Sequence, residues 1–314
     1  MRLLQVIRII GCFFERKLYF CLVKKNMIMY KNKFFLPFWV ALCLLTAHTS
    51  TLYAVSKADS LSFACAQWNW QKSGRVCIGR TQLNLFGSVQ TISIARYPSR
   101  RLRTDVIHAP GEEAASTSTL AERFGGKVAI NASFFDMKNL TPVTYLKYDG
   151  NVVADPAPGG VCNGMLLLNP KGKRIDIQTC TPDNYTKVPE GWEDAIVAGP
   201  VLIEEGRSVD FSNELEIYNS MAVRHPRTLV GYDKKGWIYF VVVDGRAKAN
   251  AAGMNFEELT SICRWLGLYE ALNLDGGGSS TLWDAKLGVV NFPTDNRKFD
   301  HKGERKVPNI ILAR

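Results

Sequence analysis

The chain has 314 residues, of which 46% are hydrophobic and 11% aromatic, and its formal net charge is +10. This length and apolar content exclude an intrinsically disordered chain and allow one large domain or two ordinary ones. Residues 1–54 contain eight of the 39 basic residues but only one of the 29 acidic residues, so the remainder carries a formal charge of +3. Because that remainder has no basic stripe interleaved with aromatic residues, we expect no nucleic-acid partner.

The N-terminal segment, residues 1–54, has the pattern of a targeting signal. A basic stretch at 30–33 precedes an apolar run at 34–45 and a small, polar tail that ends at Ala54. The apolar run is too short for a transmembrane helix, so we expect cleavage after Ala54, no stable membrane span afterwards, and a secreted or periplasmic protein. Translation from Met27 or Met29 would give a signal of conventional length.

The region 55–126 is predicted to be an N-terminal β-rich region. It opens with a polar linker at 55–62, and partial alternation of apolar and polar residues at 81–86, 89–96 and 103–109 predicts an antiparallel meander. Capping Ser and Thr residues before Leu120, with Gly125 and Gly126 after it, predict a short helix at 116–124.

The remainder, residues 127–314, is expected to form the main domain. Strands are predicted at 127–131, 229–232, 237–243, 269–274 and 310–313, with hairpins around 149–150, 169–172 and 284–288 and a strand broken by a turn within 193–203. Asn255 as N-cap, Glu258 as its capping-box partner and Gly267 at the end delimit one clear helix. Many short strands and only two helices predict an α+β fold with strand-dominated mixed or antiparallel sheets.

Cysteine and histidine usage limits the chemistry. The cysteines that follow the signal segment are Cys65, Cys77, Cys162, Cys180 and Cys263. In an exported protein the two near pairs, 65 with 77 and 162 with 180, could each close a hairpin, and the fifth cysteine would be a buried apolar residue. Neither the cysteines nor the histidines have zinc-ligand spacing.

The stretch from Asp275 to Thr281 reads DGGGSST and follows a short apolar strand. Three consecutive glycines indicate a turn that needs positive φ or close approach to a ligand. We expect free backbone N–H groups of Gly276, Gly277 and Gly278, with the hydroxyls of Ser279 and Ser280, to form an anion-binding cradle beside the Asp275 carboxylate. A glycine-rich hairpin turn capped by the aspartate is the plain structural alternative.

Two arginines flank one predicted hairpin at the same end. Arg227 precedes its first strand, and Arg246 follows its second strand in the sequence Asp244-Gly245-Arg246. A guanidinium matches the oxygens of phosphate or carboxylate, so the pair could bind an anionic substrate. An ion pair of either arginine with Asp244 is the alternative.

Seven sequence blocks together resemble the phosphodiester glycosidase family from about residue 127 to the C-terminus. They are NASFFD at 131–136, AGP at 198–200, RHPRT at 224–228, VDGR at 243–246, GM at 253–254, NLDGGGSST at 273–281, and Glu304-Arg305 with the residues to Asn309. Residues 132 and 133 are Ala and Ser where family members often have two glycines. Before residue 127 the resemblance is weak.

The resemblance implies an exported hydrolase that cleaves a sugar, of the N-acetylglucosamine type, from a small-molecule or glycan sugar-1-phosphodiester at the glycosidic C–O bond. Asp275 or Asp244, with Glu304 as a third candidate, would supply the nucleophile or base. Arg227, Arg246 and the turn at 276–280 would bind phosphate, and Asn131, Asp136 and Asn309 would bind the sugar. No cofactor is required by this reading.

Two alternatives remain open at this point. The first is a non-catalytic carbohydrate or cell-wall binding protein that keeps the pocket. The second is a metal-assisted phosphodiesterase with Ca²⁺ or Mg²⁺ on Asp244 and Asp275. The sequence makes no prediction about the oligomeric state.

Overall fold

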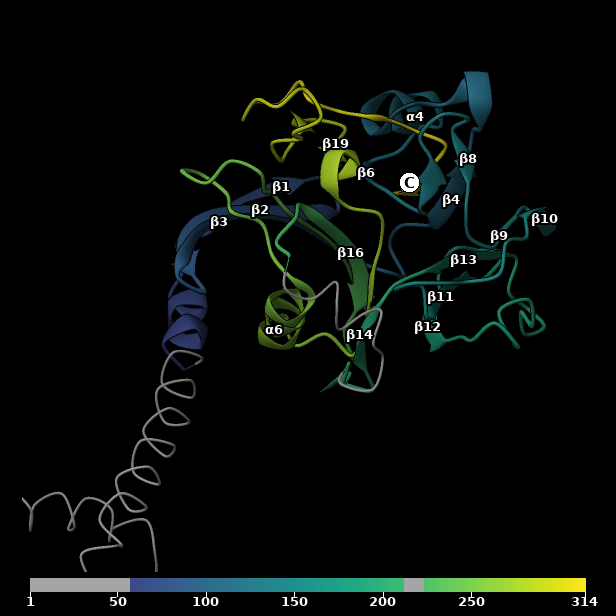
Figure 1. Ribbon diagram of the computed structural model, residues 1–314, viewed down its shortest axis with the longest axis horizontal. Coiled ribbons are helices and arrows are strands. Elements are labelled where there is room, and N and C mark those ends of the chain that lie inside the picture. The colour runs from purple at the N-terminus through teal and green to yellow at the C-terminus, as the bar shows by residue number, and fades with distance from the viewer. Residues whose placement is uncertain (1–56, 212–222) are drawn as a thin grey trace, which may run out of the picture. The chain divides into compact units, whose positions relative to one another are not determined.

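A computed structural model describes residues 57–211 and 223–314, and residues 59–314 form one compact unit. The expected signal segment and its cleavage site lie outside the described residues. All pairs of named strands are antiparallel, and the strands form three large sheets with few helices (Figure 1). The predicted strand-dominated α+β class is confirmed.

The largest sheet has eight strands and runs through both predicted regions of the chain. In spatial order they are β1 (Asn69–Ser73), β2 (Val76–Leu85), β3 (Ser88–Pro98), β17 (Trp237–Val243), β16 (Arg227–Tyr232), β18 (Glu270–Asn273), β14 (Val201–Glu204) and β15 (Arg207–Ser208). The predicted three-stranded meander is wrong in its last member, because β3 pairs with β17 and the next strand of the chain lies in another sheet. Strands before and after residue 126 therefore belong to one sheet.

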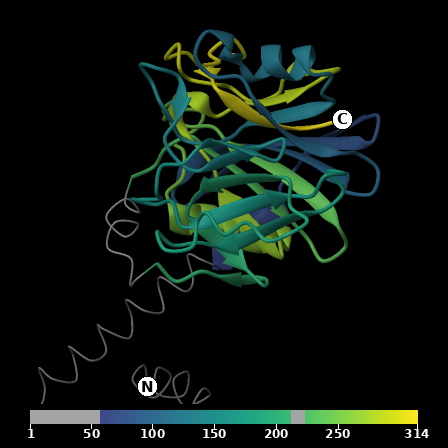
Figure 2. The same ribbon diagram turned by 90° about the vertical axis from the view of Figure 1, so that its right-hand side faces the viewer.

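Two five-stranded sheets complete the framework. One contains β20 (Gly288–Val289), β19 (Leu282–Asp284), β6 (Val128–Asn131), β22 (Asn309–Ala313) and β4 (Thr104–His108), and the other contains β10 (Asn151–Ala154), β9 (Leu146–Tyr148), β13 (Asp194–Ala198), β11 (Gly164–Leu168) and β12 (Ile175–Thr179). The final strand β22 pairs with β6 and β4, strands from much earlier in the chain (Figure 2). The small pairs are β21 (Lys306–Val307) with β5 (Ala115–Ser116) and β7 (Phe135–Asp136) with β8 (Thr141–Pro142).

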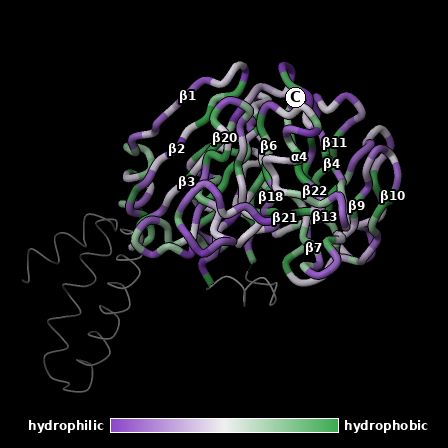
Figure 3. The backbone as a smooth tube through the Cα atoms, turned by 90° about the horizontal axis from the view of Figure 1, so that it is seen from above, coloured by the Kyte–Doolittle hydropathy of each residue, from purple (hydrophilic) through white to green (hydrophobic). Residues whose placement is uncertain are grey.

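The core explains why the central strands read as continuous apolar runs. In β17, Phe240 and Val242 face the core shared with the two smaller sheets, whereas Val241 and Val243 face a second core under the helix of residues 256–266. Successive side chains of a strand point to opposite faces, so a strand buried on both faces has no polar side. Hydrophobic segments accordingly follow the strands in Figure 3, while the connections are largely hydrophilic.

Both predicted helices are present. α4 (Thr117–Arg123) begins after its N-cap Ser116, and α6 (Phe256–Leu266) has the expected capping box and ends at Gly267 in the left-handed conformation. α4 packs on the sheet of β6 and β22, and α6 packs on the eight-stranded sheet (Figure 1). Residues 57–62, part of the polar linker expected at 55–62, are helical instead, and a short 3-10 helix, η1, spans Gly111–Glu113.

The cysteines of the described region are all free thiols, so neither expected disulfide is present in the structure. Cys162 and Cys180 nevertheless belong to one apolar cluster, and the backbone N–H of Cys180 donates to the carbonyl of Asn163 at 2.8 Å. Within residues 57–211 and 223–314, no helix is long and apolar enough to cross a membrane.

Candidate active site

Strand ends from two sheets meet at one place. β6 ends at Asn131, β18 leads into Asp275, and β16 begins at Arg227 beside the end of β17. The sheets are joined there by a hydrogen bond of 2.8 Å from the Thr228 hydroxyl to Asn131 Oδ1. Antiparallel pairing places the end of one strand beside the start of the next, which brings these separate sequence blocks together.

Asn131 holds the glycine-rich turn in place. Its Nδ2 donates to the carbonyl of Asp275 at 2.7 Å, and its Oδ1 accepts from Thr228 and from the backbone N–H of Thr281. The Asn131 side chain has no exposed surface. This geometry favours a positioning role over the predicted contact with a sugar.

The turn after β18 contains a 3-10 helix, η2 (Gly277–Ser279), and differs from the cradle expected from the sequence. The backbone N–H groups of Gly276, Gly277, Ser279 and Ser280 already donate to acceptors within the protein. Four of the amides that could have bound an anion are thus occupied. Of the three glycine amides expected to bind an anion, those of Gly276 and Gly277 are therefore engaged, and side chains beside the turn become the main candidates for binding an anion.

Two arginine side chains lie directly against the glycines of this turn. A Cβ on Gly277, whose φ is 64°, would lie 2.8 Å from Nη2 of Arg246, and a Cβ on Gly278 would overlap the guanidinium of Arg305. Arg246 is exposed and itself has a left-handed φ of 62°, which directs its side chain over the turn. A side chain at either position would displace the guanidinium group beside it, and the positive φ of Gly277 independently favours glycine.

Arg305 is the site residue that sequence reasoning missed. Its Nε donates to Asp295 Oδ1 at 2.8 Å, and it lies close enough to oppose the rise in the pKa of Asp275. Its position in the family-like block that begins at Glu304 was a usable signal, but only the carboxylate of that block was predicted as a site residue.

Asp275 is a half-buried carboxylate with altered acidity. Burial raises its pKa to about 6, while Ser279, the backbone N–H of Gly276 and the charges of Arg305 and Arg246 act in the opposite direction. Gly276 N–H donates to its Oδ1 at 2.9 Å. The Ser279 hydroxyl lies beside the carboxylate but makes no hydrogen bond of normal geometry. A carboxylate whose pKa lies close to neutral pH, beside two cations, suits nucleophilic or general-base chemistry.

Arg227 is engaged within the protein, by the backbone carbonyls of Met254 and Val223. Only 8% of the residue is exposed, its Nε donates to the carbonyl of Met254 at 2.9 Å, and its guanidinium lies 4.1 Å from the ring centre of Phe256. Burial lowers its pKa to about 10. Among the described residues neither Arg227 nor Arg246 forms an ion pair with Asp244, so the alternative of a salt-bridged pair does not apply.

Asp244 lies deeper than Asp275. It is 1% exposed, and its Oδ1 accepts from Asn291 Nδ2 at 2.9 Å and from the N–H of Phe292 at 3.0 Å. Burial raises its pKa to about 7, while the hydrogen bonds from Asn291 and Phe292 and the charge of Arg80 oppose the rise. Asn291 also donates to the carbonyl of Ser280, which connects Asp244 to the glycine-rich turn.

The remaining candidates have local partners. Both carboxylate oxygens of Glu304 accept from Ser118 in the first turn of α4, and burial raises the pKa of Glu304. Asp136 accepts from two backbone N–H groups of its own turn, those of Lys138 and Asn139. Asn309 is fully buried and exchanges two hydrogen bonds with Ser133. The three side chains are thus engaged by neighbouring groups of the protein.

The hydroxyls of Ser279, Ser280 and Thr281 are buried and have no hydrogen-bond partner in the described part of the chain. Residues 57–211 and 223–314 contain no group of three or more His, Cys, Asp or Glu side chains arranged to hold a metal ion. Asp244 and Asp275 are thus not accompanied there by a third such ligand.

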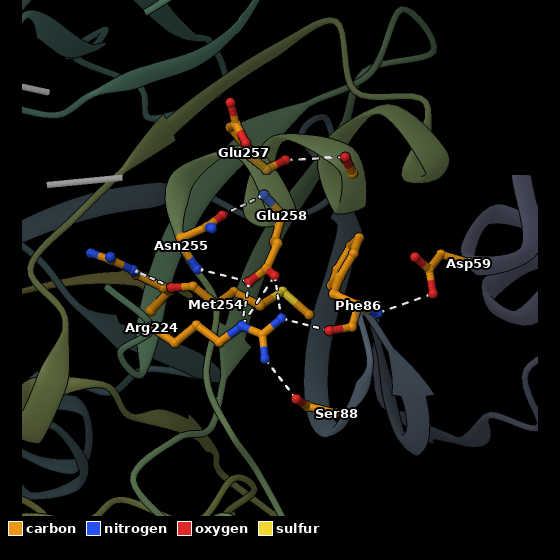
Figure 4. Close-up of polar contacts among 10 residues, drawn as sticks. Asp59, Phe86, Ser88, Arg224, Met254, Asn255, Glu257 and Glu258 are labelled. Carbon is orange, nitrogen blue, oxygen red and sulfur yellow. Dashed lines mark hydrogen bonds and ion pairs between the residues drawn. The ribbon is translucent and has the colours of Figure 1, made fainter. Parts of the chain in front are cut away.

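A second polar network fixes the segment that leads to Arg227. Arg224 binds both carboxylate oxygens of Glu258, with Nε to Oε2 at 2.9 Å, and donates to Ser88 and to the carbonyl of Phe86 (Figure 4). Glu258 simultaneously closes the capping box of α6 with Asn255. The start of α6, the β2–β3 turn and residue 224 are therefore held as one unit.

Comparison with known proteins identifies the family. A family model described as phosphodiester glycosidase matches residues 124–314. The chain belongs to the phosphodiester glycosidase family. The N-acetylglucosamine-1-phosphodiester α-N-acetylglucosaminidase of mouse is 26% identical over 211 residues, which cover 62% of this chain and 40% of the mouse protein.

Solved structures agree on the fold. The catalytic domain of the zebrafish N-acetylglucosamine-1-phosphodiester α-N-acetylglucosaminidase superposes with a TM-score of 0.60 at 20% identity, covering 79% of this chain and 86% of that one. A hypothetical protein from Synechocystis gives a TM-score of 0.56 at 17% identity, with 79% and 63% covered. Because the alignment with the mouse protein spans only 40% of its length, activity and substrate do not transfer automatically.

Proposed function

We propose that this phosphodiester glycosidase hydrolyses a sugar-1-phosphodiester at the bond between the anomeric carbon and the phosphate oxygen. The carrying observation is the Asp275 carboxylate, with a pKa of about 6, beside the guanidinium groups of Arg246 and Arg305 across a glycine turn. A sugar of the N-acetylglucosamine type is supported by the substrate named in the mouse relative.

The two arginines reduce the need for a general acid, because they stabilise the negative charge of the leaving group. Cleavage breaks the C1–O bond, and its electron pair leaves with the phosphate oxygen. The product is a phosphate monoester whose negative charge guanidinium groups can stabilise. Such a leaving group needs less protonation than an alkoxide. The cationic side chains beside the turn supply that stabilisation, in place of the backbone amides expected from sequence.

Asp275 acts on the sugar side of the bond. As a base it takes a proton from water while the water oxygen bonds to C1, and as a nucleophile it forms a glycosyl ester that water then hydrolyses. Both routes need the ionised carboxylate. The N–H of Gly276 bonds the carboxylate itself, and Asn131 holds the backbone carbonyl of Asp275. Asp244 is buried too deeply for direct contact in this arrangement, and we assign it to support of the turn through Asn291.

We further propose that the protein is exported by the N-terminal segment, on the basis of the basic, apolar and small-residue order of residues 30–54.

Hydrolysis of a panel of sugar-1-phosphodiesters, including UDP-N-acetylglucosamine, in ¹⁸O-labelled water tests the proposal. We expect free sugar that carries the label and an unlabelled phosphate monoester, with turnover abolished in Asp275→Asn. Label in the phosphate, together with loss of activity in EDTA, would instead establish a metal-assisted phosphodiesterase. Saturable glycan binding without product would establish a binding protein.

A further inference from the structure

A cavity lies next to Asn291, through Val290 and through His301, which bonds to the Asn291 carbonyl. Its volume is about 360 Å³, and it is lined by Asn69, Gln71, Ile78, Arg80, Leu287, Val289, Val290 and His301. This volume falls in the lower range of small-ligand sites. None of these lining residues belongs to the sequence blocks that carry the family resemblance.

Strand register explains why the polar groups of the cavity converge. In the β1–β2 pair, Asn69 lies opposite Arg80 and Gln71 lies opposite Ile78. Directly opposed residues of an antiparallel pair share one face of the sheet. Two amides and one guanidinium are thus presented together, above an apolar floor that includes Ile78.

The facing wall is fixed by buried hydrogen bonds. Asp284 accepts from Ser73 Oγ at 2.8 Å and from the backbone N–H groups of Lys286 and Leu287. His301 Nδ1 lies 2.6 Å from the carbonyl of Asn291, and its ring stacks on Phe292 with centroids 4.3 Å apart. A carbonyl only accepts, so Nδ1 donates and Nε2 is left to bind a ligand hydroxyl as an acceptor. The walls are therefore formed before any ligand binds.

The charge of the cavity selects its ligand. Arg80 forms no ion pair among the described residues, its guanidinium lies 5.3 Å from the ring centre of Phe292, and none of the described lining residues is acidic. The acidic neighbour, Asp244, is sealed behind the wall with its Oδ1 already engaged. An anion would meet a positive charge and hydrogen-bond donors here, whereas a cation would meet no acidic side chain among the described lining residues.

From this geometry we propose that the cavity binds a sugar bearing a phosphate or carboxylate group, with Arg80 on the anion and Asn69, Gln71 and His301 on the hydroxyls. Asn291 contacts both His301 and the carbonyl of Ser280, so the cavity adjoins the candidate active site through a single residue. The ligand is either a distal part of the substrate or a separate anionic sugar. Only the first of these sources rests on the proposed function.

Calorimetric titration of the full chain with glucose 6-phosphate, with glucose as the neutral comparison, tests the site. We expect glucose 6-phosphate to bind at least tenfold more tightly than glucose and Arg80→Gln to weaken its binding at least tenfold, which corresponds to the loss of one charge-assisted contact. Arg80→Lys and His301→Gln should give intermediate losses. Arg100→Gln, the same charge change at an exposed arginine, should have no effect, and thermal unfolding checks that each variant folds.

The candidate active site could also bind phosphate, so Arg246→Gln serves as a second reference. Binding that survives Arg246→Gln but is lost in Arg80→Gln supports the cavity, and the reverse pattern overturns it, as does an absence of millimolar binding. A raised KM with retained kcat in Arg80→Gln on a phosphodiester substrate would assign the bound group to the substrate. An unchanged KM beside lost titration binding would assign it to a separate sugar, and both results leave the cleavage reaction itself to the isotope experiment.

Discussion

At the scale of single residues, the site depends on how two guanidinium groups and one carboxylate share a turn without forming an ion pair. Arg305 is bound to Asp295, whereas Arg246 is exposed and forms no ion pair in the described part of the chain. Both charges oppose the rise in the pKa of Asp275. Arg246 is thus free to turn toward a substrate phosphate, and Arg305 is held rigidly by its partner.

Arg246→Gln should lower kcat/KM by about 10- to 100-fold, because a charge-assisted contact to the phosphate is lost. The acid limb of the pH profile should also move. Activity that needs ionised Asp275 rises with pH around its pKa of about 6, and removing a nearby positive charge should shift that limb upward. Steady-state kinetics between pH 4 and 8 measures both effects. Lys248→Gln, an exposed cation on the same loop, is the matched control, and a limb unmoved in Arg246→Gln would contradict the assignment.

At the scale of elements, α6 stabilises the back of the eight-stranded sheet without entering the chemistry. Its capping box satisfies two N-terminal backbone donors, and Glu258 also holds Arg224 (Figure 4). Its apolar stripe, which includes Leu259 and Ile262, packs on strands whose other face forms the main core. Loss of the cap should therefore affect stability more than catalysis.

Asn255→Ala should reduce the free energy of unfolding by about 1 kcal/mol, the usual effect of removing an N-cap side chain. Urea denaturation measures the change. Ser261→Ala, on a partly exposed position of the same helix where the hydroxyl bonds back to Glu257, should be neutral or slightly stabilising. Equal losses in the two variants would show that the cap has no special role, and kcat should be unchanged in both.

At the scale of the whole molecule, buried carboxylates make the stability depend on pH. Burial raises the pKa of Asp244 to about 7 and that of Glu270 to about 7, from ordinary values of 3.8 and 4.5. At pH values between the ordinary pKa and the raised pKa, these carboxyl groups are protonated in the folded protein and ionised in the unfolded chain. The free energy of unfolding should therefore be highest below about pH 4 for these groups and fall as pH rises toward 7.

Asp244→Asn should flatten this fall, because the amide keeps an acceptor for Asn291 and Phe292 but cannot ionise. Each titrating group contributes at most about 1.4 kcal/mol per pH unit. Denaturant unfolding at pH 4.5, 6 and 7.5 compares the variant with the unchanged chain and with Glu257→Gln, an exposed control. A slope that is identical in all three proteins would exclude Asp244 as a source of the dependence.

Local patterns in the sequence were sufficient for most elements. Capping residues and terminal glycines marked α4 and α6 because the bonds involved span only a few residues. Turn residues marked the β9–β10, β11–β12, β16–β17 and β19–β20 hairpins for the same reason. The helical residues 57–62 and strand β1 were not predicted, since neither carries a clear apolar period.

The strand-dominated class, the two predicted helices and the chemical blocks could all be predicted from the amino-acid sequence, because periodicity, capping residues and motif order depend on nearby residues. Which blocks lie together became known from the three-dimensional arrangement of the strands. That arrangement brought the charge of Arg305 close to Asp275, bonded Asn131 to the carbonyl of Asp275, and engaged the amides of Gly276 and Gly277, two of those expected to bind an anion. Those outcomes depend on strand register and on contacts between residues more than a hundred positions apart, as in the bond from Asn131 to Asp275, and no local pattern encodes such contacts.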